Sequence, residues 1–555
     1  MLLSSAVLAP LLAQFVSFFR GYPVHIGTIQ PAAFATQAHC KYRPKAILDK
    51  YLCAPPILPG KETDRQLESR PNTTLETVAA PEDAATVPLC VDLDGTLVKS
   101  DTFHDALCLL LRQRPASLFR IPGWLIGGGK ARVKAEVAAV VPLDATHLPY
   151  NQAVLHFLGE QHKLGRPIYL VTGADASLAH RVASHVGLFS GVLASDGSTN
   201  LTGSHKLAGL QQRFAEFDYI GNASPDLPAL AHSRHAYTAN PSPGLRSELK
   251  SHRIHAVQSF QDRKPLLPSV LKAIRTHQWA KNILLILPLL LSHKVSLQTM
   301  IPAVEAFFCF SFIASANYLL NDLLDIESDR RHLRKRLRPF AAGDLSVFAG
   351  FAIALLLVAA SCALLPQLPA AFGLWLLAYA VTTSAYSLYL KRVPLIDVLV
   401  LSGLYTLRML AGGAATGTMI SPWLSSFAVF LFLSLAIVKR FSELANLRER
   451  GGTNSHGRGY LVTDLEQIRA FGTASAYAAV VVFSLYISRP DVDALYHHAT
   501  RLWLIVPIMI YWLSRVWLLA SRGELDEDPV IFAIRDPASL ALGVCVAVLA
   551  VFATF

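Results

Sequence analysis

The sequence predicts an α/β domain built on a parallel sheet, followed by an all-α polytopic bundle of about nine membrane-spanning helices. Charged residues make up only 16% of the 555 residues, whereas soluble domains carry about 25%. Between residues 89 and 226, short apolar runs that end in polar residues alternate with helical stretches. From residue 269 onward, apolar stretches of membrane-spanning length follow one another. A soluble part therefore precedes a membrane-embedded part.

Composition divides the chain into four segments. The apolar residues 1–19 lack the basic start and the cleavage site of a secretory signal. Residues 54–88 are rich in Pro, Thr, Glu and Asp, which is typical of a linker. The seven cysteines are scattered without a CxxC spacing, so no disulfide framework or zinc site is expected. We expect a poorly defined N-terminal segment and linker over 1–84, an α/β domain over 85–255, a linker over 256–268 and a membrane domain over 269–555.

Polar residues suited to phosphoryl transfer follow the predicted strands at 89–91, 168–171 and 217–220. Such side chains meet, because ligands bind at the carboxyl ends of parallel strands. Attack on phosphorus needs a carboxylate nucleophile, a neighbouring acid/base, a cation for the phosphate oxygens and a metal ion. The candidates are Asp92 as nucleophile, Asp94 as acid/base, Thr172 and Lys206 as phosphate-binding residues, and Asp92 and Asp226 as ligands of Mg²⁺.

These motifs, in this order, are similar to those of the haloacid dehalogenase (HAD) superfamily, and to its phosphoserine-phosphatase-like branch in particular. The resemblance covers about residues 85–255 and implies a Rossmann-type fold with a helical cap between Asp101 and Val154. One position departs from the family pattern, since Asn222 stands where most members carry an aspartate. An amide can still bind a metal through its carbonyl oxygen, but the site loses a charge. Phosphatase activity is expected, with a catalytically silent domain as the alternative.

The membrane domain contains nine apolar stretches, near 277–292, 300–320, 346–365, 369–389, 395–416, 423–438, 468–487, 502–520 and 538–555. If the first span starts from inside, the loops on that side carry 15 Lys and Arg residues, against 3 on the other side. Such an excess marks the cytoplasmic side. We therefore expect a multi-pass protein of the inner (cytoplasmic) membrane with a cytosolic α/β domain. The net charge of +11 then reflects these loops, and no nucleic acid partner is expected.

The loop after the second span begins with an aspartate-rich segment. At about 100° per residue, Asp322, Asp325 and Asp329 fall on one narrow face of a continuous helix. Three carboxylates this close repel one another unless a cation lies among them, and Mg²⁺ that also binds a diphosphate is the economical solution. Basic residues that follow, Lys335 and Arg338 among them, are candidates for binding the phosphate oxygens.

This segment, NDLLDIESD from Asn321 onward with a basic run ending in Arg338-Pro339, closely resembles the first signature of the UbiA superfamily of membrane prenyltransferases. The resemblance covers about residues 267–555 and includes Lys391 in the YSLYLKR segment. It implies that Asp322, Asp325 and Asp329 bind Mg²⁺ and diphosphate. The leaving diphosphate is then stabilised electrostatically while positive charge develops on carbon.

The second signature differs from the commonest form of the family, in which a second acidic cluster follows the sixth helix. Here this place holds Lys439, Arg440 and Glu443. Together with Lys281 in the RTHQWAKN segment, it is most similar to the branch that transfers phosphoribose to polyprenyl phosphate. Cations in place of carboxylates suit two phosphorylated substrates, so Lys281, Lys439 and Arg440 are further candidates for phosphate binding.

Two ionisable residues lie within one predicted span. Asp397 and Arg408 are 11 residues apart, which places both on one helix face. Ionisable residues inside a membrane are candidates for a functional site, although Asp397 is also close enough to the cytoplasmic end to be an interface charge.

The sequence thus predicts a transferase that moves phosphoribose from phosphoribosyl pyrophosphate onto a polyprenyl phosphate in the bilayer, using Mg²⁺. The HAD-like domain would dephosphorylate the product at high effective concentration. The alternative is prenylation of an aromatic or quinone precursor from a polyprenyl diphosphate, with a HAD-like domain that is silent or acts on an unrelated phosphate.

Overall fold

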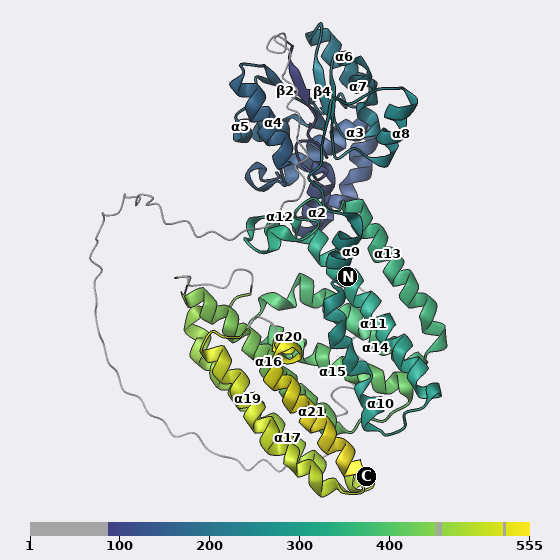
Figure 1. The fold of residues 1–555 in the computed structure, drawn as a ribbon, viewed down its shortest axis with the longest axis vertical. Helices are drawn as coiled ribbons and strands as arrows, with labels where there is room; N and C mark the ends of the chain where they lie inside the picture. The colour runs from purple at the N-terminus through teal and green to yellow at the C-terminus, as the bar shows by residue number, and fades with distance from the viewer. Residues whose placement is uncertain (1–86, 450, 452–457, 526–528, 555) are drawn as a thin grey trace, which may run out of the picture. The chain divides into compact units, whose positions relative to one another are not determined.

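The computed structural model describes residues 87–554 except 450, 452–457 and 526–528. The N-terminal segment and linker expected over 1–84 lie outside the described residues. Residues 79–555 form one compact unit. Within it, an α/β domain is followed by a bundle of long helices (Figure 1).

Six parallel strands form the sheet of the α/β domain, in the order β3-β2-β1-β4-β5-β6. They are β1 (Leu89–Val91), β2 (Ile168–Asp175), β3 (Gly191–Ser195), β4 (Asp218–Gly221), β5 (Ala236–Ala239) and β6 (Gln258–Phe260). The chain starts in the middle of the sheet and then builds outward on both sides. The carboxyl end of β1 therefore lies between those of β2 and β4, the place where open α/β sheets bind ligands.

Helices cover both faces of this sheet. They are α2 (Thr102–Gln113), α3 (Ile121–Val140), α4 (Gln152–Lys163), α5 (Ala176–Val186), α6 (Ser204–Arg213), α7 (Leu227–His232) and α8 (Pro243–Ser251). Alternate residues of β1 enter two different cores, Leu89 and Val91 on one side and Cys90 on the other. A strand buried on both faces explains why β1 is a continuous apolar run. The segment between β1 and α4, where a helical cap was expected, is largely helical.

The strands predicted at 89–91, 168–171 and 217–220 correspond to β1, β2 and β4. Strands β3, β5 and β6, which are short, were not predicted from the sequence. Strands β3 and β6 form the two edges of the sheet, and β5 lies beside β6. Because β6 pairs with β5 inside the segment expected to be a linker over 256–268, the sheet extends through Phe260, beyond the expected boundary at 255.

Eight helices among the described residues are long and apolar enough to cross a membrane. They contain α11 (Leu297–Leu324), α13 (Val347–Leu364), α14 (Ala370–Leu388), α15 (Ile396–Thr416), α16 (Pro422–Glu449), α17 (Leu465–Ile487), α19 (Ile505–Ser521) and α21 (Pro537–Thr554). Each matches one of the predicted spans from the second to the ninth. The fold class predicted from the sequence, an α/β domain followed by a membrane bundle, is confirmed.

The first predicted span, 277–292, differs from the prediction. It is not one continuous helix but a 3₁₀ segment over Thr276–Leu285 followed by the short helix α10 (Leu287–Leu291). Arg275, with φ 55°, separates this segment from the preceding helix α9 (Leu266–Ile274). The expected count of about nine is therefore corrected to eight spanning helices in the part of the chain that the structure describes.

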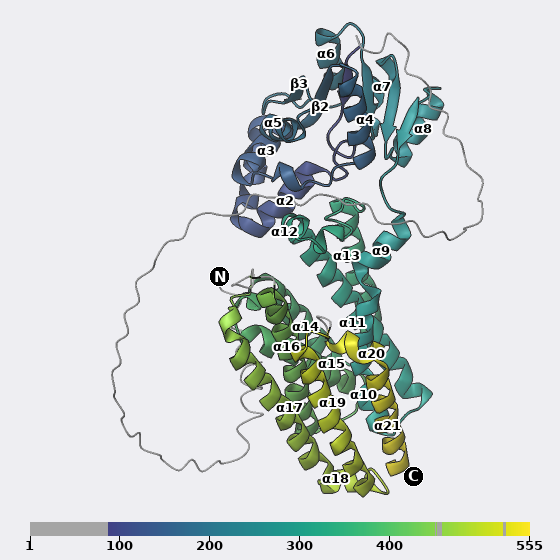
Figure 2. The ribbon, with the colours of Figure 1, turned by 60° about the vertical axis from the view of Figure 1, so that its left-hand side comes forward.

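Helices α16, α17 and α19 run side by side in the bundle (Figure 2). Gly472 of α17 lies against Trp517 of α19, where an added Cβ would be 2.1 Å from the indole ring. Large apolar side chains such as Phe348, Leu355 and Leu356 of α13 remain exposed in the protein alone. Such exposed apolar faces suit contact with lipid.

Candidate active sites of the two domains

The candidate site of the α/β domain lies at the carboxyl end of β1. Asp92 follows this strand and is buried, with 5% of its surface exposed. The ammonium group of Lys206 donates to Asp92 Oδ1 at 2.8 Å and to Asp226 Oδ1 at 2.8 Å. Lys206 lies near the start of α6, and Asp226 follows β4. Residues from three separate sequence motifs therefore meet at the Lys206 ammonium nitrogen.

A tyrosine and a backbone amide fix the position of Asp226. The Tyr219 hydroxyl donates to Asp226 Oδ1 at 2.9 Å and the backbone N–H of Asn222 donates to Oδ2 at 3.1 Å. The Asn222 side chain lies against the turn after Asp92, since a Cβ added at Gly95 would be 1.9 Å from Asn222 Nδ2. The Asn222 amide, at the position where the resemblance predicts an aspartate, is therefore next to the turn that follows Asp92.

Asp94 is held by the first residue of α2, because the Thr102 backbone N–H donates to Asp94 Oδ1 at 2.8 Å. Burial, together with the negative charges of Asp101 and Asp92, raises the pKa of Asp94 to about 7. Burial also raises the pKa of Asp92 to about 6, although Lys206 opposes this shift. A carboxyl group with a pKa near neutrality can both give and take a proton, which suits the acid/base role expected for Asp94.

Thr172 and Lys134 complete this site from β2 and the helical segment. Thr172 is fully buried and its hydroxyl accepts from the Ala174 backbone N–H at 3.0 Å. The ammonium group of Lys134, in α3, donates to the Gly173 carbonyl at 2.6 Å and to Asn200 Oδ1 at 3.2 Å. Burial lowers the pKa of Lys134. Lys134 and Tyr219 were not among the predicted site residues, because only the tertiary fold brings their side chains here.

The candidate site of the membrane domain is the aspartate-rich segment after α11. The helix ends at Leu324 and a second short helix, α12 (Ile326–Arg331), begins after Asp325, whose φ and ψ are −98° and 7°. The single continuous helix assumed for the three aspartates is therefore interrupted at Asp325. Arg338 Nη1 donates to Asp322 Oδ1 at 3.0 Å and to Asp329 Oδ2 at 2.7 Å. Asp322 and Asp329 thus converge on one cation.

Asp325 contacts a different pair of cations. Lys391 Nζ lies 3.4 Å from Asp325 Oδ2, and Arg112 Nη2 lies 3.2 Å from Asp325 Oδ1. Lys391 follows α14 (Ala370–Leu388), so two of the loops predicted on the same side of the membrane meet here. Asp325 is consequently neutralised by side chains from outside its own loop.

Arg275 adds a further cation that the sequence analysis did not single out. Its Nη2 donates to Asp322 Oδ1 at 2.6 Å and to Oδ2 at 2.9 Å, and its guanidinium lies 4.8 Å from the centroid of the Tyr318 ring. Lys335 is exposed nearby. Burial raises the pKa of Asp329 to about 6 even though Arg338 favours its charged form. The site is therefore rich in buried charge of both signs.

Mg²⁺ fits the donor groups of both sites. Among the described residues no group of three or more His, Cys, Asp and Glu side chains is arranged to hold a metal. In each site, however, two carboxylates lie within 3.0 Å of one nitrogen, Lys206 in the α/β domain and Arg338 in the membrane domain. Oxygen ligands that already converge on a cation match the preference of Mg²⁺.

The residues of the second signature form a different kind of cluster. Arg440, with 2% of its surface exposed, donates from Nε to Asp397, from Nη1 to Glu443 at 2.7 and 2.8 Å, and from Nη2 to the Tyr386 hydroxyl at 3.0 Å. The Tyr460 hydroxyl also donates to Asp397. Protein groups thus bind all three nitrogens of Arg440. This geometry favours a buried structural ion cluster over the phosphate-binding role expected from the sequence, and Lys439 is a half-buried neighbour in the same helix.

Arg408 lies in a second buried network. Its Nε donates to Asn282 Oδ1 at 2.8 Å and its Nη2 to the Tyr379 hydroxyl at 2.9 Å. The guanidinium also lies over the Tyr405 ring, and Lys281 Nζ is 5.8 Å from the centroid of the same ring. As predicted, Arg408 and Asp397 both face the interior of the bundle. Asp397 is fully buried, however, rather than an interface charge. Asn321, by contrast, is half-buried.

The fold and the aspartate-rich segment are those of an integral membrane transferase whose bundle is preceded by an α/β domain. The chain belongs to the UbiA prenyltransferase family, whose family model matches residues 283–551. An uncharacterized protein of Sinorhizobium fredii is 37% identical over 465 residues, which cover 83% of this chain and 90% of that protein. This alignment is longer than the membrane half, so the relative shares both halves.

Other relatives match about half of this chain. Decaprenyl-phosphate phosphoribosyltransferase of Mycobacterium tuberculosis is 34% identical over 279 residues, covering 49% of this chain and 89% of the relative. Nodulation protein NoeC of Azorhizobium caulinodans is 34% identical over 295 residues, covering 51% and 92%. Among solved structures, a UbiA homolog from Archaeoglobus fulgidus bound to GPP and Mg²⁺ aligns with TM-score 0.39 and 18% identity, covering 51% of this chain and 98% of that one. A substrate-bound phosphoserine phosphatase aligns with TM-score 0.22 and 12% identity, covering 34% and 97%.

Proposed function

We propose that the membrane half transfers phosphoribose from phosphoribosyl pyrophosphate to a polyprenyl phosphate, and that the HAD-like half then removes the 5-phosphate from the product. The charge of the membrane site carries this proposal. Four cationic side chains, Arg275, Arg338, Lys391 and Arg112, contact the three aspartates of the segment. The excess of positive charge suits two phosphorylated substrates, and the phosphoribosyltransferase relatives support the same assignment.

In the transfer step, a phosphate oxygen of the lipid attacks C1 of the ribose while the bond from C1 to the diphosphate breaks, and pyrophosphate leaves. Bound Mg²⁺ would offset the charge of the diphosphate. Asp322, Asp325 and Asp329 would hold the ion. Arg338 and Lys391, which contact these carboxylates, would bind the phosphate oxygens. The cations of the site would stabilise the negative charge of the leaving diphosphate while positive charge develops on C1.

In the phosphatase step, the Asp92 carboxylate attacks phosphorus and the ribose 5-oxygen leaves with a proton from Asp94. Water then hydrolyses the aspartyl phosphate, with Asp94 taking the proton of the water. Lys206 and Thr172 would hold the phosphate oxygens, and Asp92, Asp226 and the carbonyl oxygen of Asn222 would hold Mg²⁺. The raised pKa of Asp94, about 7, is compatible with giving and taking a proton near neutral pH.

Helix α2 supports the idea that the two reactions follow each other. Its first residue, Thr102, contacts Asp94, and its eleventh, Arg112, contacts Asp325. At 1.5 Å per residue, about 15 Å of helix separates these two residues. A product made at the membrane site is thus formed near a phosphatase that shares the same unit. We place the charged loops and the HAD-like domain on the cytoplasmic side of the inner membrane, because Lys and Arg are concentrated in those loops.

The decisive experiment incubates the purified full chain in detergent with Mg²⁺, labelled phosphoribosyl pyrophosphate and polyprenyl phosphates of several lengths. The matched reaction contains polyprenyl diphosphate and an aromatic acid. We expect a labelled lipid and free pyrophosphate only from the first pair. If a product arises only from the second pair, the enzyme is instead an aromatic prenyltransferase.

The Asp92→Asn variant tests the phosphatase half in the same assay, with Asp196→Asn, an exposed aspartate outside the site, as its control. We expect Asp92→Asn to accumulate the 5-phosphorylated lipid, because it lacks the nucleophile, while transfer continues at the wild-type rate. A wild-type enzyme that leaves the phosphate on the lipid would show that the domain is silent.

A further inference from the structure

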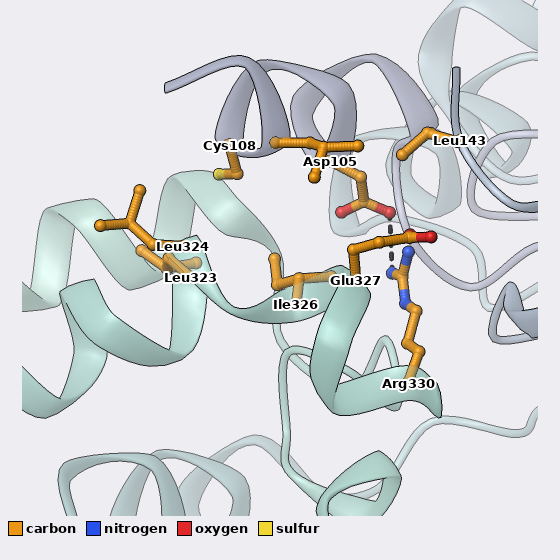
Figure 3. Close-up of a pocket in the computed structure, with 9 residues that line it drawn as sticks. Asp105, Cys108, Leu143, Leu323, Leu324, Ile326, Glu327 and Arg330 are labelled. Atoms are coloured by element: carbon orange, nitrogen blue, oxygen red, sulfur yellow. Dashed lines mark hydrogen bonds and ion pairs between the residues drawn. The ribbon is translucent and has the colours of Figure 1, made fainter. Parts of the chain in front are cut away.

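The HAD-like domain is docked on the aspartate-rich segment through a buried ion pair. Arg330 of α12 donates from Nη2 to Asp105 Oδ2 of α2 at 2.7 Å and to the Ser100 hydroxyl at 3.0 Å. Both side chains of the ion pair are 2% exposed. Figure 3 shows the two charged groups facing each other, with Cys108, Leu323 and Ile326 beside them. A buried pair of this kind is costly to break, because separation would leave two unpaired charges in an apolar contact.

A second contact lies at the loop that follows Arg338. Gly343 has φ 73°, and a Cβ added there would be 2.7 Å from the Cβ of Lys99. The ammonium group of Lys99 lies 3.9 Å from Asp344. The backbones of the two domains therefore approach each other closely at Gly343, which follows Arg338 of the proposed diphosphate site. The Arg330–Asp105 ion pair and the Gly343–Lys99 contact thus fix the position of α2 relative to the membrane site.

This docking brings Arg112 to the aspartate-rich segment. Arg112 lies in the last turn of α2, far outside the residues matched by the family model. Its guanidinium and the Lys391 ammonium each contact a different oxygen of the Asp325 carboxylate, at 3.2 and 3.4 Å. The Arg112 side chain is 17% exposed, so it is partly shielded from water. Lys391 comes from the membrane half and Arg112 from the soluble half.

We propose that Arg112 is a positioning residue of the membrane transferase, supplied by the soluble domain to hold Asp325 and to add positive charge beside the diphosphate. The inference rests on the proposed assignment of Asp325 to the diphosphate site. It deepens that assignment, because one half of the chain then completes the substrate site of the other. The relatives that match about half of this chain, over 89% and 92% of their own length, have no room for a comparable second domain.

The test compares Arg112→Ala with Arg112→Lys and with Arg114→Ala, an exposed arginine two residues further on. Binding of inorganic pyrophosphate with Mg²⁺ is measured by calorimetry on the full chain, with Asp329→Ala used to subtract binding elsewhere. We expect Arg112→Ala to weaken the binding roughly five- to tenfold, Arg112→Lys to restore most of it, and Arg114→Ala to match the wild type. In the transfer assay KM for the donor rises more than kcat falls, because the change acts on substrate binding.

The outcomes separate this inference from the proposed function. Equal pyrophosphate affinity in Arg112→Ala and the wild type overturns the role of Arg112, whatever the transfer assay gives. If pyrophosphate binding falls as expected but the wild type transfers no phosphoribose, the inference stands and the proposed reaction is wrong. Absence of Mg²⁺-dependent pyrophosphate binding in the wild type overturns both.

Discussion

The two candidate sites solve the same problem of charge in different ways. In the α/β domain, Lys206 links Asp92 and Asp226 with two contacts of 2.8 Å, and all three residues belong to motifs at strand ends or at the start of a helix. In the membrane domain, Asp322 and Asp329 share Arg338, whereas Asp325 turns to Lys391 and Arg112. A parallel sheet brings its strand ends together by topology, while a loop between membrane helices needs partners from elsewhere.

The largest effect is expected from the paired aspartates of the membrane site. Asp322→Ala and Asp329→Ala should each reduce transfer at least about a thousandfold, since either change removes a metal carboxylate from a preorganised site. Phosphatase activity on a soluble phosphate ester should stay unchanged, and Glu466→Ala, an exposed acid on α17, is the matched control. Normal transfer by either variant would remove these aspartates from the reaction.

The ion cluster around Arg440 should affect stability rather than substrate binding. Arg440→Ala leaves Asp397 fully buried without its cation, although Glu443 keeps Arg458 at 3.1 Å, and this costs about 3 to 5 kcal/mol of folding free energy. Thermal unfolding in detergent measures this loss, with Arg469→Ala on the surface as control. An undiminished Tm together with a raised KM for phosphoribosyl pyrophosphate would instead make Arg440 a substrate ligand.

In contrast to Arg440, Arg338 should affect substrate binding more than stability. Arg338→Ala should raise the KM for phosphoribosyl pyrophosphate about ten- to a hundredfold, because a charge-assisted bond worth about 1.5 to 3 kcal/mol is lost. The melting temperature should fall less than in Arg440→Ala, because Asp322 keeps Arg275 as a partner and the Arg338 side chain is 26% exposed. Steady-state kinetics at saturating polyprenyl phosphate measure the effect. An unchanged KM would mean that the donor diphosphate binds elsewhere.

The smallest effect is expected at Asn222 of the α/β domain, where the resemblance to the HAD superfamily predicts an aspartate. Asn222→Asp restores a carboxylate next to the turn that follows Asp92. We expect the Mg²⁺ concentration at half-maximal phosphatase activity to fall about three- to tenfold, since a charged ligand binds the ion more tightly than an amide. A titration with MgCl₂ on both forms measures it. An increase in the required Mg²⁺ would show that the extra charge is unfavourable there.

Sequence patterns were most informative where chemistry is encoded locally. The strands that precede Asp92 and Asp226 or contain Thr172 were predicted, as were eight of the nine apolar stretches. The first stretch was wrongly predicted as one helix, because apolar composition does not distinguish the 3₁₀ segment over Thr276–Leu285 from an α-helix. The position of Asp325 was also predicted wrongly, because one continuous helix was assumed and the helix ends at Leu324.

By itself, the sequence determined the fold class of each half, the order of the polar motifs in the α/β domain and the aspartate-rich segment, because periodicity, apolar length and local spacing follow directly from residue order. Only the tertiary structure decided how the charges are paired. Arg112 and Asp325 are more than two hundred residues apart in the sequence. Arg275, which lies between two helical segments, forms an ion pair with Asp322. The partner of a charged side chain depends on which elements pack together, and packing brings together residues that are far apart in the sequence.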